Sequence, residues 1–293
     1  MAFTSGTVTG SGNNDQYSGH KNLLMTFNTF VTTGLPAGQN WVVSRAVANV
    51  VGIQQDYEIQ WRAPGLSSND NIYMGIKTYQ DATVDYYNFK IGVFTGYVAG
   101  NSFETQAGSS PIMGCTLWNQ SIDYWFIADG QRAIVVIKIL DVYESFYIGK
   151  YLPYATPTQY PYPVAIWASM PTAAYLRYSD TTLISGFKGT RANFVIRDVS
   201  GIWIQPDCYP YSSTTQLRNT TNLSTNAAGY YGLHSIILSN STPNVYGELS
   251  GIYYITGFNN ATENTIVLNG FSYMVFRDRR SVGFNDYIAV RLS

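Results

Sequence analysis

The chain has 293 residues, enough for one large β domain or two smaller ones with a sizeable buried core. Only 12% of the residues are charged, about half of the roughly 25% that is usual in soluble domains, and the net charge is −1. This balance provides no general electrostatic attraction to nucleic acids or anionic lipids, and no apolar run approaches the roughly 18 residues needed to span a bilayer. We therefore expect neither nucleic-acid binding nor membrane insertion.

The composition predicts a folded chain rich in β-structure. Aromatic residues make up 15% of the chain and Val, Ile and Thr recur throughout, whereas disordered chains lack both kinds of residue. The first residues are rich in Thr, Ser and Gly and do not form a basic-then-apolar signal, so we expect production in a cytoplasm. Both cysteines, Cys115 and Cys208, should then remain reduced.

The first 33 residues predict an arm followed by a helix. Residues 1–19 are expected to form an extended arm that becomes ordered only on a neighbouring subunit. Their small apolar surface cannot offset a backbone entropy of about 1–2 kcal/mol per residue. Between Lys21 and Thr33 apolar residues recur at helical spacing, and Gly34 then provides a stop signal. These apolar residues are Leu23, Leu24, Phe27, Phe30 and Val31.

Strands are predicted in the middle of the chain, where alternating or wholly apolar runs are bounded by Gly, Pro, Asn and Asp. The Asp129-Gly130 pair predicts a hairpin turn, and the nearly all-apolar run Ala133–Leu140 predicts a strand covered on both faces. The expected strands are Trp41–Arg45, Tyr57–Trp61, Tyr73–Tyr79, Tyr86–Val93, Tyr124–Ala128, Ala133–Leu140 and Ser145–Tyr151.

Four prolines in Tyr151–Pro163 predict an ordered loop that is neither strand nor helix. Short strands are expected afterwards, and the polar stretch Ser212–Ala228 is expected to be a long loop. The strands are Ala174–Tyr178, Asn193–Arg197, Gly201–Ile204, Ser235–Leu238, Ile252–Ile255, Thr265–Leu268, Tyr273–Arg277 and Tyr287–Leu292. The pattern favours a mainly β fold, a β-sandwich or barrel-like arrangement with a short N-terminal helix. Residues 20–170 would form the main β domain and residues 171–293 a second β region or subdomain.

Few residues are suited to catalysis. The two histidines, His20 and His234, lie in no recognisable motif and far from the cysteines, so we expect no metal and no cofactor. A glycosidase needs only two carboxylates, and Glu104 and Glu144 are the candidates, Glu144 lying beside aromatic residues that could stack on a sugar. The alternative is that both are ordinary strand or loop charges, and we expect no enzymatic activity.

Tyrosines and arginines provide candidate interface residues. A proline-restricted loop cannot bury all of its tyrosines, so we expect some of them to face another molecule, unless the loop folds back to cap its own barrel. The basic cluster near residue 279 favours a loop salt bridge or a subunit contact over a phosphate site. The interface candidates are Tyr151, Tyr154, Tyr160, Tyr162, Arg277, Arg279 and Arg280.

Three stretches carry a resemblance to a known family: Asp85–Phe89, Leu117–Arg132 and Tyr147–Pro163. They resemble virion structural proteins of tailed bacteriophages, in which a YWF-x-A-x-G-R-R strand pair precedes a Y-x-G-x-x-L-P-Y-A-T-P-x-x-Y-P-Y-P loop. This chain has Gly130-Gln131-Arg132 where two arginines are commoner. The resemblance extends over residues 15–210, with weaker matches at Leu23-Leu24, Trp41, Leu176-Arg177 and Gly201-Ile202-Trp203.

The resemblance implies a non-enzymatic part of a phage particle, most plausibly in the tail tip or baseplate, with a head-associated or connector position as the alternative. The chain would be assembled in the host bacterial cytoplasm and become part of the virion, with copies of itself and other virion proteins as partners. A receptor- or glycan-binding virion module that recognises a host surface glycan through Tyr and Trp platforms is a second hypothesis. A glycosidase is the third.

Overall fold

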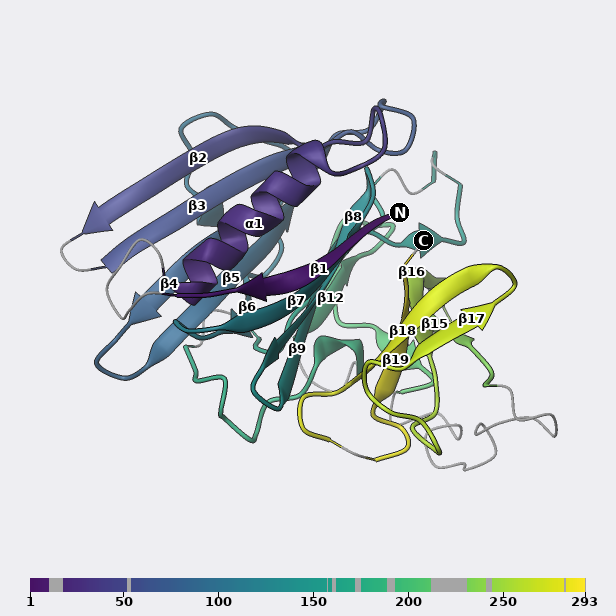
Figure 1. Ribbon diagram of the computed structural model, residues 1–293. Helices are drawn as coiled ribbons and strands as arrows, with labels where there is room; N and C mark the ends of the chain where they lie inside the picture. Colours follow the sequence, from purple (N-terminus) through teal and green to yellow (C-terminus); the bar gives the residue numbers. More distant parts are fainter. Residues whose placement is uncertain are drawn as a thin grey trace.

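A computed structural model of the chain describes residues 1–10, 18–51, 54–156, 158–159, 162–171, 175–188, 193–211, 231–240, 244–281 and 283–292. These residues form three antiparallel sheets, called A, B and C here, and one α-helix near the N-terminus (Figure 1). The expected mainly β fold with an N-terminal helix is therefore confirmed. The expected loop Ser212–Ala228 lies outside the described residues.

Sheet A is built around the hairpin that the Asp129-Gly130 pair predicts. Seven of the eight residues of β8 are buried, which confirms a strand covered on both faces. Across the sheet the strands are β1 (Ala2–Val8), β7 (Ile122–Ala128), β8 (Arg132–Ile139), β9 (Val142–Lys150), β11 (Val164–Trp167), β12 (Phe194–Arg197) and β13 (Trp203–Ile204).

Strand β1 (Ala2–Val8) corrects the first part of the expected N-terminal arm, of which residues 11–17 lie outside the described residues. It pairs antiparallel with β7 of its own chain, from Ala2 opposite Ala128 to Val8 opposite Ile122. Backbone hydrogen bonds to β7 thus supply the order that we expected from a neighbouring subunit. An edge strand needs few apolar side chains, so the Thr, Ser and Gly residues of β1 did not indicate a strand.

Helix α1 (Gly19–Thr33) matches the expected helix and begins two residues earlier. The Gly34 amide donates to the carbonyl oxygen of Phe30 at 2.8 Å and ends it. Its buried Phe27 ring meets Trp61 edge-on, at a centroid distance of 5.8 Å, and Phe126 at 5.2 Å. Because these two partners belong to β3 and β7, one helical side chain packs against sheets A and B together.

Sheet B follows the helix, with strand order β2-β3-β4-β5-β6. Its strands are β2 (Val42–Val51), β3 (Gln54–Ala63), β4 (Ile72–Asp81), β5 (Tyr86–Phe94) and β6 (Met113–Thr116). At one edge, Gly114 of β6 exchanges two backbone hydrogen bonds with Met170. At the other edge, β2 pairs only with β3 among the described residues.

Sheet C contains most of the C-terminal strands. Across the sheet they are β14 (Asp207–Tyr209), β15 (His234–Ser239), β16 (Val245–Tyr254), β19 (Tyr287–Arg291), β18 (Phe271–Arg277) and β17 (Thr265–Leu268), and β10 (Leu152–Pro153) also pairs with β16. Strands β12 and β13 belong to sheet A, so residues 171–293, the expected second β region, contribute strands to both sheet A and sheet C.

Two expectations for irregular segments need correction. Leu152–Pro153, expected to be loop, forms β10 because its backbone pairs with Gly247 and Glu248, which the local sequence cannot reveal. The described residues 175–178 of the expected strand Ala174–Tyr178 are not in a strand. Short 3₁₀ turns occur at Phe103–Thr105 and Gly186–Lys188.

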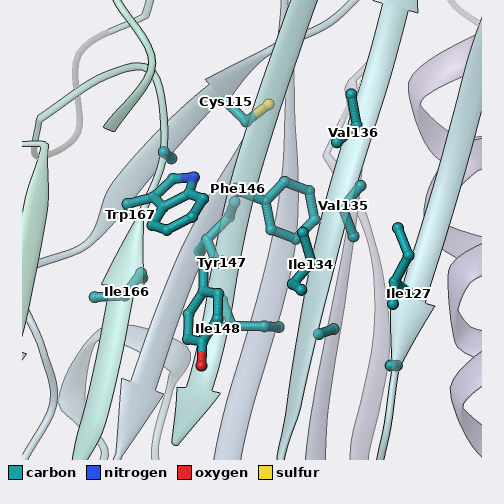
Figure 2. Close-up of a cluster of buried hydrophobic side chains, with 14 of the residues drawn as sticks. Cys115, Ile127, Ile134, Val135, Val136, Phe146, Tyr147, Ile148, Ile166 and Trp167 are labelled. Atoms are coloured by element: carbon teal, nitrogen blue, oxygen red, sulfur yellow. The ribbon is translucent and has the colours of Figure 1, made fainter. Parts of the chain in front are cut away.

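The main core lies on both faces of sheet A. Figure 2 shows Phe146 and Tyr147, neighbours on β9, on opposite sides of that strand. Tyr147 packs on Trp167 at a centroid distance of 5.2 Å, while Phe146 meets Phe27 at 6.3 Å. The same continuous cluster includes Ile252 of sheet C, so all three sheets share one core.

Candidate assembly surface

The structure separates the loop tyrosines into a buried one and exposed ones. Tyr151 is only 1% exposed, and its hydroxyl donates to the carbonyl oxygen of Arg197 at 3.5 Å. Its side chain cannot reach another molecule, so its assignment as an interface residue is wrong. Tyr154 and Tyr162 remain 58% and 37% exposed, and Tyr160 lies outside the described residues.

The loop is nevertheless attached to its own chain. The Tyr154 amide donates to the carbonyl oxygen of Tyr246 at 3.0 Å, and its phenol donates to Glu248 Oε2 at 3.3 Å. The Tyr162 ring lies 5.6 Å from the Arg197 guanidinium. The loop therefore caps part of its own fold, as the second alternative expected, and it leaves the rings of Tyr154 and Tyr162 at the surface.

Strand β10 aligns an exposed aromatic and apolar surface, which we call the Tyr154 patch. Leu152 lies opposite Glu248, and the Tyr154 amide bonds to Tyr246, so these four side chains share one face of sheet C. Leu152 is 42% exposed and Tyr154 58%. Burial, followed by the nearby Asp198 carboxylate, raises the pKa of Tyr246.

Arg279 lies in the interior and not at an interface. It is 5% exposed and forms an ion pair with Glu144, which is completely buried. The Thr116 hydroxyl donates to the same carboxylate oxygen of Glu144. Burial lowers the pKa of Arg279 to about 10. Arg279 is therefore wrong as an interface candidate, and Glu144 has no surface on which a sugar could bind.

The two flanking arginines also act within the chain. Arg280 donates to both carboxylate oxygens of Asp141 at 3.0 Å. Arg277 donates to the Asp141 carbonyl oxygen at 2.8 Å and lies 5.4 Å from the centroid of the Tyr143 ring. The expected loop salt bridge is confirmed, and it connects the end of β18 to the turn between β8 and β9.

The remaining candidates for chemistry are dispersed. Glu104 is exposed and lies 3.6 Å from Lys77. His20 is buried, which lowers its pKa well below 6.5, and His234 is half-buried on β15. Within the described ranges, no three His, Cys, Asp or Glu side chains form a group that could hold a metal ion, and no helix is long and apolar enough to cross a membrane.

Strand β2 is a long sheet edge that was not predicted from the sequence, which indicated a strand only over Trp41–Arg45. It is ten residues long and runs along the outer edge of sheet B (Figure 1). Val42 and Val43 are 49% and 39% exposed, and the only charged side chain, Arg45, donates to Glu58 at 2.9 Å. The sequence could have indicated a long strand here, because the run Val42–Val51 is rich in Val and contains no Pro, no Lys and a single Arg.

The other sheet edges are shorter or covered. Strand β6 is bridged to Met170, β1 has seven residues and runs beside α1 in Figure 1, and β13, β14 and β17 have two to four residues. Natural proteins usually protect long edges with charges, prolines or covering segments. Among the described strands, β2 is therefore the edge best suited to pairing with another chain.

No protein-family model matches the chain, and no curated protein is significantly similar to it.

Proposed function

We propose that the chain is a non-enzymatic structural component of a tailed bacteriophage particle, in the tail tip or baseplate, that acts through protein–protein contacts. The observation that carries the assembly role is the ten-residue edge strand β2, which pairs only with β3 within the described part of the chain. The assignment to a phage particle is supported by the resemblance over residues 15–210, including the tyrosine loop that forms part of the Tyr154 patch.

The backbone of β2 is a template for another strand. An edge strand presents a row of N–H and C=O groups that pair readily with a further strand. Ser44 forms a bulge, and its carbonyl oxygen accepts a hydrogen bond from the Tyr97 hydroxyl at 3.0 Å. From Arg45 to Val51 the register with β3 is regular, which leaves a seven-residue stretch for pairing.

A second copy of the chain fits this edge. The single charge of β2, on Arg45, is already paired with Glu58, so like-charge repulsion does not oppose pairing of β2 with itself. An antiparallel pair of identical strands is self-complementary about a two-fold axis. The Tyr154 patch supplies a separate contact for other virion proteins, since exposed aromatic residues are frequent anchors of interfaces.

Self-association of the purified chain tests the role of β2. Sedimentation velocity from micromolar to near-millimolar concentration should show a reversible dimer. Ala46→Lys, which places a charge at an exposed position in the middle of β2, should weaken the dimer at least about tenfold. Val98→Lys, at a loop position that is 46% exposed, is the matched control and should dimerise normally. A chain that stays monomeric throughout, or a variant that dimerises as before, contradicts this role.

Membership of a virion is tested separately. Mass spectrometry of purified phage particles from the source that encodes the chain should detect it as a stoichiometric component. Its absence from intact particles would overturn the proposal. Images of labelled particles would then distinguish a tail-tip or baseplate position from a head or connector position.

A further inference from the structure

A polar pocket lies away from the assembly surfaces just described. It has a volume of about 290 Å³ and is lined by Tyr86, Leu176, Arg177, Ser179 and Asp180. Tyr86 begins β5, and the other four residues belong to one loop. None of these residues takes part in the β2 edge or the Tyr154 patch.

Two buried side chains, Asn88 and Arg279, fix the backbone of the loop that lines the pocket. Asn88 is 1% exposed, and its amide nitrogen donates to the Leu176 carbonyl oxygen at 2.8 Å, while the Leu176 amide donates back at 3.3 Å. Arg279 donates to the carbonyl oxygens of Tyr178 at 2.6 Å and Asp180 at 3.0 Å. The pocket wall is therefore organised before any ligand arrives, which reduces the entropy cost of binding.

The pocket presents donors and acceptors side by side. Arg177 Nε donates to the Val84 carbonyl oxygen at 2.8 Å, which orients the guanidinium and leaves its terminal N–H groups without a partner among the described residues. Asp180 Oδ1 accepts from the amide and the hydroxyl of Thr182, both at 2.7 Å, and Oδ2 has no such partner. The exposed Ser179 hydroxyl can both donate and accept.

This mixture favours a neutral, hydroxyl-rich ligand. The Asp180 carboxylate opposes an anion and the Arg177 guanidinium opposes a cation, whereas sugar hydroxyls both donate and accept hydrogen bonds. The half-buried Tyr86 ring offers an aromatic surface for the apolar face of a sugar ring. We propose that this pocket binds one neutral monosaccharide unit of a glycan.

The size of the pocket is consistent with a single sugar unit. Its volume lies just below the range of about 300–1,000 Å³ that is typical of sites for drug-sized ligands. A second polar pocket, of about 200 Å³, is lined by Asp70, Lys150 and Tyr162 among others. In this second pocket the Lys150 ammonium donates to the Asp70 carboxylate at 2.8 Å. These two groups are already paired, so the pocket offers a ligand fewer open polar partners.

Sugar binding is measured on the full chain by saturation-transfer NMR and titration calorimetry. The probes are neutral hexoses, N-acetylhexosamines, a hexuronate and a hexose phosphate. At least one neutral sugar should bind saturably and more tightly than either anionic sugar. Preference for an anionic sugar, or no saturable binding of any neutral one, overturns the proposal.

Variants assign the binding to the pocket. Arg177→Gln removes the charged donors and Tyr86→Ala removes the ring, and each should weaken binding at least about tenfold. Arg62→Gln, on the half-buried Arg62 of β3, is the matched control and should bind normally. Melting temperatures verify that each variant is folded. Unchanged affinity in both folded pocket variants places the sugar elsewhere and overturns the proposal.

Discussion

Arg279 connects distant parts of the chain through one buried guanidinium. It forms its ion pair with Glu144 of β9 and donates to the Thr116 hydroxyl of β6 at 3.4 Å. It also holds two carbonyl oxygens of the loop that lines the polar pocket. Removal of one partner of such a pair leaves an uncompensated charge in the interior, which is costlier than removal of both.

Arg279→Met should lower the free energy of unfolding by about 3–5 kcal/mol, because it leaves the Glu144 carboxylate buried without its cation. The double variant Glu144→Leu/Arg279→Met should recover much of that loss, since no charge remains buried. Urea unfolding of the single and double variants measures both effects. A loss below about 1 kcal/mol for Arg279→Met would mean that the pair is hydrated in solution.

The buried tyrosines predict an alkaline unfolding transition. Burial raises the pKa of both Tyr143 and Tyr254 to about 12, whereas tyrosines of an unfolded chain ionise near pH 10. As the pH rises from about 10 to 12, the unfolded chain releases protons that the folded chain retains, so the free energy of unfolding falls. Tyrosinate absorbance should therefore rise together with the loss of circular dichroism. A chain that stays folded while all its tyrosines titrate near pH 10 would contradict this expectation.

Only part of the candidate site could be predicted from its individual residues. The prolines indicated that the loop cannot bury all of its tyrosines, and Tyr154 and Tyr162 are exposed. Their contact with another molecule stays a prediction. The prolines could not indicate that Tyr151 is buried, because its environment depends on the distant Arg197. The Glu144–Arg279 pair was hidden for the same reason, since it requires the packing of sheet C against sheet A.

At the scale of elements, β8 carries the centre of the core. Ile137 is completely buried and lies opposite Tyr124 on one side and Glu144 on the other. Ile137→Asp should abolish folding, because it buries an unpaired charge at a cost of several kcal/mol. Soluble expression and circular dichroism measure the outcome.

Leu140→Asp provides a matched control in the turn that follows β8. Leu140 is 63% exposed with φ of 56°, a conformation that Asp tolerates better than Leu. This variant should fold with at least the stability of the parent chain. Native-like Ile137→Asp protein would show that β8 is not the core strand.

Strand β1, unlike β8, was not predicted from its sequence. Its residues are typical of a polar arm, and yet they form an edge strand of sheet A. Deletion of residues 2–8 should lower the melting temperature substantially. It removes the seven residues that pair with β7, including the buried Val8 side chain. Phe3→Ser, at a side chain that is 37% exposed, should change it little. An unchanged melting temperature after the deletion would restore the interpretation of a free arm.

Periodicity explains which elements were predictable. The apolar run of β8 and the helical spacing of α1 are local signals, and both elements were predicted nearly to their ends. Strands β1, β6 and β10 have little local signal, because they are stabilised by partners distant in the sequence. The sequence also could not indicate that β12 and β13, which lie after residue 170, return to sheet A.

At the scale of the whole molecule, the shared core predicts one cooperative unfolding transition. All six tryptophans precede Asp207, the first residue of β14, so their fluorescence reports mainly on sheets A and B. Trp125 also contacts Phe276 of β18, at a centroid distance of 5.1 Å. Circular dichroism, in contrast, reports equally on all three sheets. The two probes should give the same urea midpoint, because Arg279 and β10 tie sheet C to the remainder. Two separate midpoints would mean that sheet C unfolds as an independent subdomain.

The position of β2 at the edge of sheet B also limits the symmetry of any assembly that forms through it. Two copies that join through β2 use the same surface on both sides, so the contact is isologous and is consumed once the pair has formed. Such pairing ends at a dimer and builds neither a ring nor a filament. A particle that arranges the chain around a three-fold or six-fold axis must therefore close its rings through a different surface, and the β2 contact would join one ring to the next.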